Sequence, residues 1–327
     1  MINNLLVDDI RRFFFIFMTG LNTLQIILTA ALPILIVFIL ILVRDNSRFV
    51  IRHYRVSDGR IPKQLKLVFI TDLHEKSYGE NNRKLLEAIE GICPDAVLIG
   101  GDTIIANRVR KLARRRSGSG EILPVGQWCG CSLSLMKGLT DKYPVYFSNG
   151  NHETKLCTDP AAGPWIRTFY KMLEDCGVKI LNRESTGLAE SVILYGLDLP
   201  KEYYRKFRKH SLSPETVREL AGVPDRDSYN ILLAHKPDFF DAYAEWGADL
   251  VLAGHVHGGM VRLPFIGGIV SPNPSLFPKY SKGEYENGSC KMIVSCGTGM
   301  HTLPLRFLNP AEVSVIDLGP ETGTGEL

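Results

Sequence analysis

The sequence lacks several features that would assign it to a specialised class of protein. Its 327 residues contain no internal repeat, no low-complexity tract and no Cys-x-x-Cys pair. The net charge is only +3, which is too small to indicate a nucleic-acid-binding protein. The seven cysteines are an odd number, so we expect reduced thiols and not a disulfide-stabilised secreted domain. With 45% apolar and 22% charged residues, a disordered or collagen-like chain is also excluded.

One long hydrophobic run near the N-terminus departs from this ordinary composition. Residues 24–43 contain only two polar side chains, Gln25 and Thr29. At about 1.5 Å per residue, the run spans roughly the 30 Å thickness of a bilayer core. We therefore predict a transmembrane helix at 24–43, preceded by an N-terminal segment, 1–23. No small-x-small cleavage site follows the run, which argues against a cleaved signal peptide.

The charges that flank this run bear on its orientation. Four arginines and one acidic residue follow it: Arg44, Asp45, Arg48, Arg52 and Arg55. Because positive charge is retained in the cytoplasm, we predict a single-pass cell-membrane protein whose C-terminal part is cytoplasmic. The dipeptide Arg11-Arg12 faintly resembles a twin-arginine export signal, which would reverse this orientation.

The rest of the chain alternates short apolar runs with amphipathic segments. Strands are predicted at 65–70, 96–99, 145–147, 192–197, 231–234, 250–253, 292–295 and 313–316, and helices at 82–92, 165–173, 214–220 and 239–246. This alternation predicts an α/β domain with sheets packed between helices. We assign 44–62 to a juxtamembrane linker and first strand, 63–320 to the domain, and 321–327 to a C-terminal tail.

Five predicted strands end in loops that carry Asp, Asn or His. These residues are Asp72 and His74, Asp102, Asn151 and His152, His235, and His255 and His257. A single such histidine is usually a satisfied polar residue, but loops at the carboxyl ends of strands are where α/β sheets place their sites. Carboxylate, amide oxygen and imidazole are ligands that Mn, Fe and Zn share. The pattern therefore indicates a metal site.

These loops resemble those of the calcineurin-like metallophosphoesterase family. The matching motifs, in the family's order, are Asp72-Leu73-His74, Gly101-Asp102, Gly150-Asn151-His152-Glu153, His235 and Gly254-His255-Val256-His257. Further stretches resemble a membrane-anchored bacterial branch of the family: 258–259, 263–267, 276–280 and 304–307. The resemblance covers roughly residues 50–318 and implies a four-layer αββα sandwich.

The resemblance also implies a role for each motif residue. It implies two divalent metal ions, manganese first and iron or zinc as alternatives. One ion would be bound by Asp72, His74 and His257, the other by Asn151, His235 and His255, with Asp102 bridging both. A metal-bridging hydroxide would be the nucleophile. His152 would face the phosphoryl group or the leaving oxygen, and Glu153 would help to hold His152.

The predicted activity is hydrolysis of a phosphodiester or pyrophosphate bond, in a lipid or a nucleotide-linked lipid. One candidate substrate within the resemblance is UDP-2,3-diacylglucosamine. A phosphomonoesterase or phosphoprotein phosphatase on the same metal centre is the alternative. A non-catalytic membrane scaffold would have lost a ligand, and all the ligand positions are present. We expect no nucleic-acid partner, and the oligomeric state stays open.

Two basic stretches and three departures from the family pattern bear on the substrate. Residues 108–116 form either an amphipathic helix for an anionic membrane surface or a solvated loop. Residues 201–209 either lie over the metal site or form a surface helix whose aromatic residues face the core. Glu153 replaces the commoner aspartate. Met260 and Cys296 stand where glutamine and arginine are frequent, and we expect both to alter substrate contacts.

Overall fold

The computed structural model describes residues 11–12, 15, 23–116, 118, 120–205, 210–271, 276–300 and 305–321. Most of the predicted N-terminal segment, residues 206–209 of the second basic stretch, residues 301–304 and the tail beyond 321 lie outside this description. The chain divides into two compact units, residues 1–44 and 45–327. All seven cysteines lie in the described part and are free thiols, as predicted.

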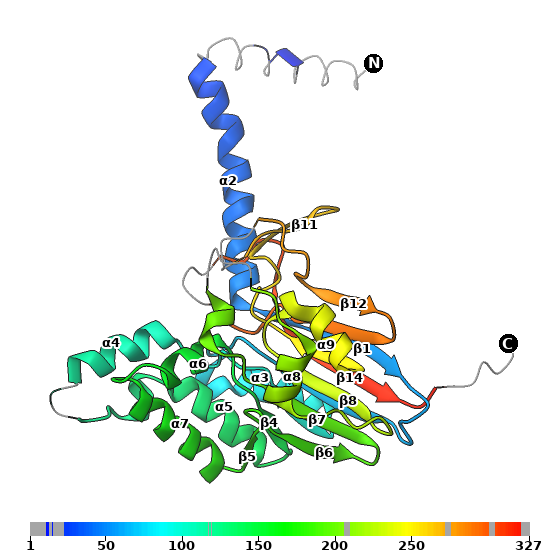
Figure 1. Ribbon diagram of the computed structural model, residues 1–327. Helices are drawn as coiled ribbons and strands as arrows, with labels where there is room; N and C mark the ends of the chain where they lie inside the picture. Colours follow the sequence, from blue (N-terminus) through cyan, green and yellow to red (C-terminus); the bar gives the residue numbers. More distant parts are fainter. Residues whose placement is uncertain are drawn as a thin grey trace, which may run out of the picture. The chain divides into compact units, whose positions relative to one another are not determined.

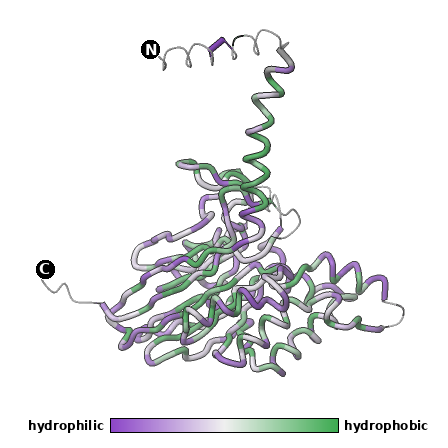
Figure 2. The backbone as a smooth tube through the Cα atoms, turned by 180° about the vertical axis from the view of Figure 1, so that it is seen from behind, coloured by the Kyte–Doolittle hydropathy of each residue, from purple (hydrophilic) through white to green (hydrophobic). Residues whose placement is uncertain are grey.

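The first unit contains most of helix α2 (Thr23–Ser47), which has Pro33 in its interior. Within its stretch Ile27–Ser47, an 18-residue window has a mean hydropathy of 2.8, and none of that window is buried. Figure 2 shows this helix as hydrophobic along nearly its whole length. By length and composition, α2 could therefore cross a membrane.

The second unit is built on two six-stranded sheets (Figure 1). The first sheet has the order β1 (Phe49–Ser57), β14 (Ala311–Gly319), β2 (Leu65–Ile70), β3 (Ala96–Ile99), β4 (Val145–Phe147) and β5 (Val178–Ile180). The second has the order β12 (Gly283–Asn287), β13 (Cys290–Val294), β9 (Leu250–Ala253), β8 (Tyr229–Ala234), β7 (Val192–Leu197) and β6 (Ser185–Ala189). A small hairpin pairs β10 (Val261–Leu263) with β11 (Gly267–Val270).

Alternate residues of the central strands face two different cores. In β2, Leu67 and Phe69 pack between the two sheets, whereas Val68 and Ile70 pack against helices. In β8, Ile231 and Leu233 pack between the sheets, whereas the intervening Leu232 packs outward. Because successive strand side chains point to opposite faces, these uninterrupted apolar runs bury both faces of each sheet.

Helices cover the two outer faces. On the first sheet lie α3 (Arg83–Ile92), α4 (Ala106–Arg116), α5 (Gly130–Thr140), α6 (Asn151–Cys157) and α7 (Gly163–Asp175). On the second sheet lie α8 (Pro214–Ala221) and α9 (Phe240–Trp246). Short 3-10 turns occur at Glu80–Asn82, Val125–Gln127, Lys201–Tyr204 (η3) and Pro237–Phe239. The predicted αββα sandwich is thus confirmed.

Strand direction brings the five polar loops together. Strands β2, β3 and β4 run parallel, as do β8 and β9, so within each sheet the loops emerge at one edge. Two glycines allow the loops to touch. A Cβ at Gly101 would collide with the backbone of Gly150, and one at Gly254 would collide with the Asp72 carboxylate.

Candidate metal centre

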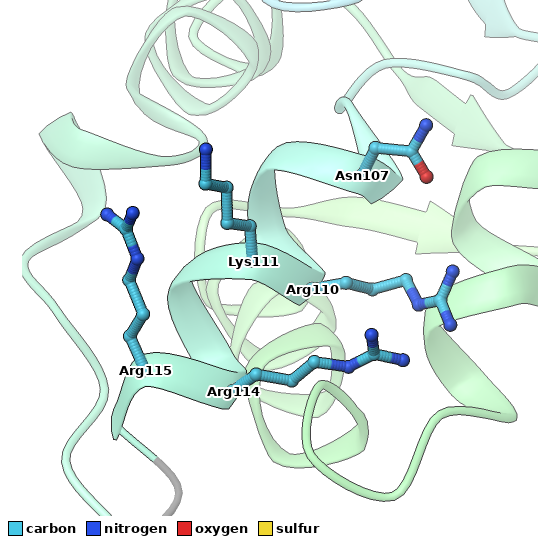
Figure 3. Close-up of a pocket in the computed structure, with 5 residues that line it drawn as sticks. All are labelled: Asn107, Arg110, Lys111, Arg114 and Arg115. Carbon is cyan, nitrogen blue, oxygen red and sulfur yellow. The ribbon is translucent and has the colours of Figure 1, made fainter.

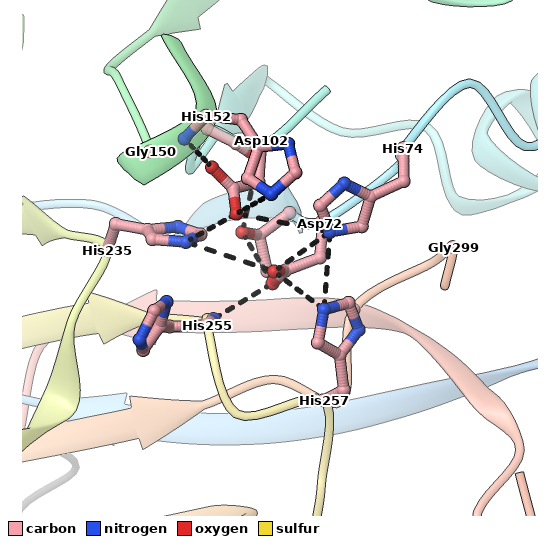
Figure 4. A network of polar contacts seen from close by, with 12 residues as sticks. Asp72, His74, Asp102, Gly150, His152, His235, His255, His257 and Gly299 are labelled. Atoms are coloured by element: carbon pink, nitrogen blue, oxygen red, sulfur yellow. Dashed lines mark hydrogen bonds and ion pairs between the residues drawn. The ribbon is translucent and has the colours of Figure 1, made fainter. Parts of the chain in front are cut away.

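Six of the seven predicted metal ligands, together with His152, lie in one buried cluster at this edge (Figure 4). Three overlapping groups have ligand atoms that all lie within 4.8 Å of one another: Asp72, His74 and His257; His74, Asp102 and His152; and Asp102, His235 and His255. The first group contains the residues of one predicted metal set, and the third contains His235 and His255 of the other set together with Asp102, the predicted bridge. The loops of both sheets therefore converge as the sequence predicts.

Asp72 is fully buried and uses its two carboxylate oxygens differently. Oδ2 accepts hydrogen bonds from Thr71 Oγ1 and from the backbone N–H of His255, both at 3.0 Å. Oδ1 has no hydrogen-bond partner and lies 3.4 Å from His257 Nε2 and 3.7 Å from His74 Nε2. One oxygen therefore anchors the carboxylate to the protein, and the other is directed at the histidines.

Asp102 also uses its two carboxylate oxygens differently. Its Oδ1 accepts the backbone N–H of His152 at 2.7 Å. Its Oδ2 lies 3.2 Å from His235 Nε2 and 3.9 Å from Nε2 of both His74 and His152. Asp102 therefore faces both halves of the cluster, which is the position that a bridging carboxylate requires.

The charges of the cluster shift its pKa values strongly. Burial alone would raise the pKa of Asp72 and Asp102, but the surrounding histidines outweigh it and lower both. Burial would lower the pKa of His235, but Asp102 and Asp72 raise it to about 10. Burial lowers the pKa of His255 and of His257 to about 3. Both carboxylates are therefore ionised at neutral pH, and two imidazoles are neutral.

The unsatisfied polar atoms of the cluster fit divalent metal ions. Asp72 Oδ1, Asn151 Oδ1 and His255 Nε2 are all buried and make no hydrogen bond. A buried polar atom without a partner costs about 1–3 kcal/mol, so several in one place need an explanation. Carboxylate, amide and neutral imidazole are suitable donors for Mn, Fe or Zn. Asn151, the seventh predicted ligand, is the first residue of helix α6.

Five of the predicted ligands adopt a left-handed backbone: Asp72 (φ 54°), His74 (46°), Asp102 (52°), His255 (71°) and His257 (49°). Non-glycine residues rarely take this conformation, which costs of the order of 1–3 kcal/mol each. The surrounding hydrogen bonds hold the loops in place: Gly101 accepts the N–H of Asp72, and Asp102 accepts that of His74. Strain concentrated at one site is typical of functional residues.

His152 is oriented by the start of helix α4. The backbone N–H of Ala106, the first residue of α4, donates to His152 Nδ1 at 2.9 Å. Because Nδ1 accepts this bond, the proton of the neutral ring lies on Nε2. Nε2 faces the cluster, 3.9 Å from Asp102 Oδ2. The ring is therefore oriented to donate a hydrogen bond into the site.

Glu153 supports the loop that carries Asp102. Its carboxylate accepts the backbone N–H groups of Asp102 (2.8 Å), Thr103 (2.9 Å) and Gly150 (3.1 Å), and the Thr103 hydroxyl at 3.1 Å. These hydrogen bonds fix the left-handed loop of Asp102, and support of His152 by Glu153 stays a prediction. Glu153 binds backbone groups about 50 residues upstream, so the local sequence gives no indication of this role.

Two buried residues that the sequence analysis did not assign support the opposite side. Arg306 donates from Nη2 to the carbonyls of Cys296 and Gly299, both at 2.8 Å, and Gly299 in turn donates its N–H to the carbonyl of Asp72. Asn309 donates from Nδ2 to the carbonyl of His257 at 2.7 Å. These residues hold the loops that carry Asp72 and His257.

The second basic stretch is described only through residue 205, in and just after turn η3. The ring of Tyr204 lies 5.6 Å from that of His255 and 6.5 Å from that of His235. Its hydroxyl is buried and has no hydrogen-bond partner. In the described part of this stretch, the Tyr204 ring therefore lies beside the site, while Tyr203 and Tyr204 also pack against the core of the second sheet, so each of the two alternatives is met in part.

The first basic stretch forms helix α4, from which its cations extend outward (Figure 3). Its apolar residues Ala106, Val109 and Ala113 are buried in the core of the domain. Arg110 pairs with Asp159 at 2.5 Å, and Arg108 donates to the carbonyl of Gln127 at 2.7 Å. The stretch is therefore helical, but its apolar face is not available to a membrane.

Met260 and Cys296, the two other departures from the family pattern, are both buried, at 8% and 0% exposure. A Cβ at Gly258 would lie 2.7 Å from Cys296 Sγ, so the thiol packs behind the His257 loop. Its carbonyl is one of the groups that Arg306 binds. Cys296 therefore contributes packing beneath the loop.

Comparison with known proteins gives consistent results. The family model described as calcineurin-like phosphoesterase matches residues 65–259. The uncharacterized metallophosphoesterase YkuE of Bacillus subtilis is 39% identical over 106 residues, which cover 32% of this chain and 36% of YkuE. An uncharacterized metallophosphoesterase of Helicobacter pylori (strain J99) is 28% identical over 267 residues, or 80% of this chain and 62% of that protein.

A more distant relative carries a more specific name. The phosphodiesterase YaeI of Escherichia coli (strain K12) is 24% identical over 210 residues, which cover 63% of this chain and 66% of YaeI. The matched segments span less than two thirds of each of these three relatives.

Proposed function

This chain belongs to the calcineurin-like phosphoesterase family, and we propose that it is a membrane-anchored, binuclear metal-dependent phosphodiesterase or pyrophosphatase. The observation that carries this proposal is that Asp72 and Asp102 each use their two carboxylate oxygens differently. Each carboxylate anchors one oxygen to the backbone or a neighbouring hydroxyl and directs the other at the histidines. A buried pair of carboxylates is costly without positive charge beside it, and two divalent cations would supply that charge.

The residues that would hold the ions fall into two sets. Asp72, His74 and His257 would bind one ion, Asn151, His235 and His255 the other, and Asp102 would bridge them. When bound, such ions lower the pKa of a water molecule and offset the negative charge of a phosphoryl group. Manganese is the first candidate. The carboxylates supply two negative charges against four positive ones, so the loaded site would attract an anion.

His152 and Tyr204 would both contact the substrate. The Nε2–H of His152 is fixed by the Ala106 N–H and would donate to the leaving oxygen as charge develops there. The unpartnered Tyr204 hydroxyl, beside His255, would donate to a phosphoryl oxygen. Neither role requires a serine or cysteine nucleophile.

Two observations favour a diester or pyrophosphate of a lipid or a nucleotide-linked lipid. YaeI, a relative over most of the domain, is named a phosphodiesterase. Helix α2 has the length and hydropathy of a membrane span, which would keep the site near the bilayer where such substrates lie. A single-pass topology with a cytoplasmic domain follows from the arginines after the span.

The test compares bis-p-nitrophenyl phosphate with p-nitrophenyl phosphate as substrates for the full chain in detergent, with manganese and with chelator. We expect manganese-dependent cleavage of the diester. Cleavage of the monoester alone would contradict the phosphodiesterase proposal and indicate a phosphomonoesterase. Undiminished activity in chelator, after dialysis, would contradict the metal centre itself.

A further inference from the structure

An exposed apolar surface surrounds the β10–β11 hairpin. Its residues, which we call the hairpin patch, are Leu263, Phe265, Ile266, Leu276, Phe277 and Leu308, with Phe265 at 109% and Leu276 at 68% exposure. They come from three segments that touch one another. Arg262 donates its N–H to the carbonyl of Phe307, and Phe277 donates its N–H to the carbonyl of Ile269. Contiguous apolar surface of this kind marks an interaction site.

The backbone of the hairpin patch is unusual. Phe265 (φ 65°), Phe277 (φ 52°) and Leu308 (φ 51°) all adopt the left-handed conformation, which is an outlier for bulky side chains. Three such residues in one surface cost several kcal/mol at about 1–3 kcal/mol each. These side chains are exposed, and backbone strain of this kind is typical of functional segments.

The hairpin patch adjoins the point where the chain enters the domain. Asp45, the first residue of the second unit, is fully buried, and its Oδ2 accepts the backbone N–H of Asn309 at 3.0 Å. Asn309 directly follows Leu308, which lines a groove together with Phe265 and Arg262. Asp45, which directly follows the last residue of the first unit, is therefore held beside the hairpin patch.

The segment that contains Leu308 and Asn309 also contacts a loop of the metal centre. Asn309 also donates to the carbonyl of His257, and β10 begins only four residues after His257. Cations lie at the margin of the patch: Arg262 in the groove, and the exposed Lys279 two residues beyond Phe277. Apolar side chains bordered by cations suit the interface of an anionic bilayer.

We propose that the hairpin patch inserts into the interfacial layer of the bilayer that α2 crosses, and so holds the His257 loop near the lipid headgroups. This inference rests on the membrane anchoring in the proposed function. It also makes the class of substrate more specific, since the phosphate of a lipid headgroup would be reached without leaving the membrane surface.

The experiment uses the full chain reconstituted into vesicles of anionic lipid, with tryptophan as a depth reporter. Phe265→Trp and Phe277→Trp place the reporter in the hairpin patch. Val223→Trp is the matched control, because Val223 is an equally apolar, 71% exposed residue outside it. The native tryptophans, Trp128, Trp165 and Trp246, are at most 3% exposed and provide a constant background.

We expect brominated lipid to remove most of the added fluorescence of Phe265→Trp and Phe277→Trp and to leave that of Val223→Trp unchanged. Quenching of all three by aqueous iodide, with no effect of bromolipid, would overturn the proposal. Protection from iodide without quenching by bromolipid would also overturn it, in favour of a protein partner or a second copy of the chain.

Two further readouts separate this proposal from the proposed function. Flotation of the vesicles tests the anchor, and a chain that fails to float with lipid would overturn anchoring and insertion together. Hydrolysis of bis-p-nitrophenyl phosphate by the same vesicles tests the chemistry. Intact bromolipid quenching without hydrolysis would support the membrane surface and overturn only the catalytic proposal.

Discussion

The two halves of the metal cluster contain similar residues but are held and charged differently. In the half formed by Asp72, His74 and His257, the His257 loop is held from behind by Asn309, and the loop that contacts Asp72 is held by Arg306. In the half formed by Asp102, His235 and His255, Glu153 binds the Asp102 loop, and His235 Nδ1 lies 2.7 Å from the carbonyl of Gly100. The ligand types alone do not distinguish the halves, but their supporting residues do.

The protonation of the two halves also differs. The pKa of His257 is lowered to about 3, mainly by burial, so this imidazole is neutral at all ordinary pH values. The pKa of His235 is raised to about 10, because Asp102 and Asp72 outweigh the effect of burial. A metal ion needs a neutral imidazole, so loading must displace a proton from His235 but not from His257. The comparison teaches that two similar ligand sets can depend on pH in different ways.

The largest effect is expected from Asp102→Asn, which removes the charge that faces both halves. Loss of several kcal/mol of charge stabilisation predicts a decrease in turnover of at least about 10³-fold. Initial rates and metal content by mass spectrometry would be measured together. Asp141→Asn, an exposed carboxylate outside the cluster, is the control. Normal turnover in Asp102→Asn would contradict the bridging role.

His152→Ala should slow turnover by about 10²–10⁴-fold without loss of metal, because His152 supplies a proton or hydrogen bond and belongs to neither metal set. Rates and metal content again provide the measurement. A decrease in bound metal would mean that His152 is a ligand, as its presence in the group with His74 and Asp102 would allow.

Asn309→Ala and Glu153→Gln form a matched pair that tests the supporting residues. Each should weaken metal binding by about 10–100-fold, since loss of an outer partner disorients the ligand it holds. The expected contrast is that Asn309→Ala weakens mainly the half with His257, whereas Glu153→Gln, which acts through the bridging Asp102, weakens both halves. Binding isotherms of Mn²⁺, followed by the paramagnetic signal of the free ion, would resolve the two classes. Equal effects of Asn309→Ala on both classes would contradict its selective support of the His257 half.

The pH dependence of metal binding should also differ between the halves. Below the pKa of about 10, His235 carries a proton that competes with the metal ion. The affinity of its half should therefore fall about tenfold for each pH unit of acidification, a competition that His257, neutral above its pKa of about 3, does not add to the other half. Mn²⁺ isotherms at about pH 6 and about pH 8 would show this. Identical shifts for both classes would contradict it.

The sequence predicts the central strands and the polar loops well, because both are local signals. The ranges 65–70, 96–99 and 250–253 are confirmed to the residue, since each is a short apolar run ended by glycine or a polar residue. The loop residues follow from the rule that sites lie where strands end. The motif order within the chain then points to the family without knowledge of the fold.

The residues that escape prediction act over long distances in the sequence. Asn309 binds a loop 52 residues away, and Glu153 binds the backbone 51 residues upstream. Strand β1, which we grouped with the juxtamembrane linker, is the parallel neighbour of β14, some 260 residues later. No local pattern of side chains encodes such pairings, because they depend on how two sheets come together.

The hydrogen bond from Ala106 to His152 has a consequence for how this chemistry is inherited. The group that fixes the imidazole proton is a main-chain amide, so almost any residue at position 106 can supply it and no sequence signature records it. Proline is the exception, and it is well tolerated at the first position of a helix. Ala106→Pro should therefore leave the fold intact and lower turnover toward that of His152→Ala, as steady-state rates and circular dichroism would show. The orientation of His152 thus depends on a backbone N–H group, which only a substitution to proline removes.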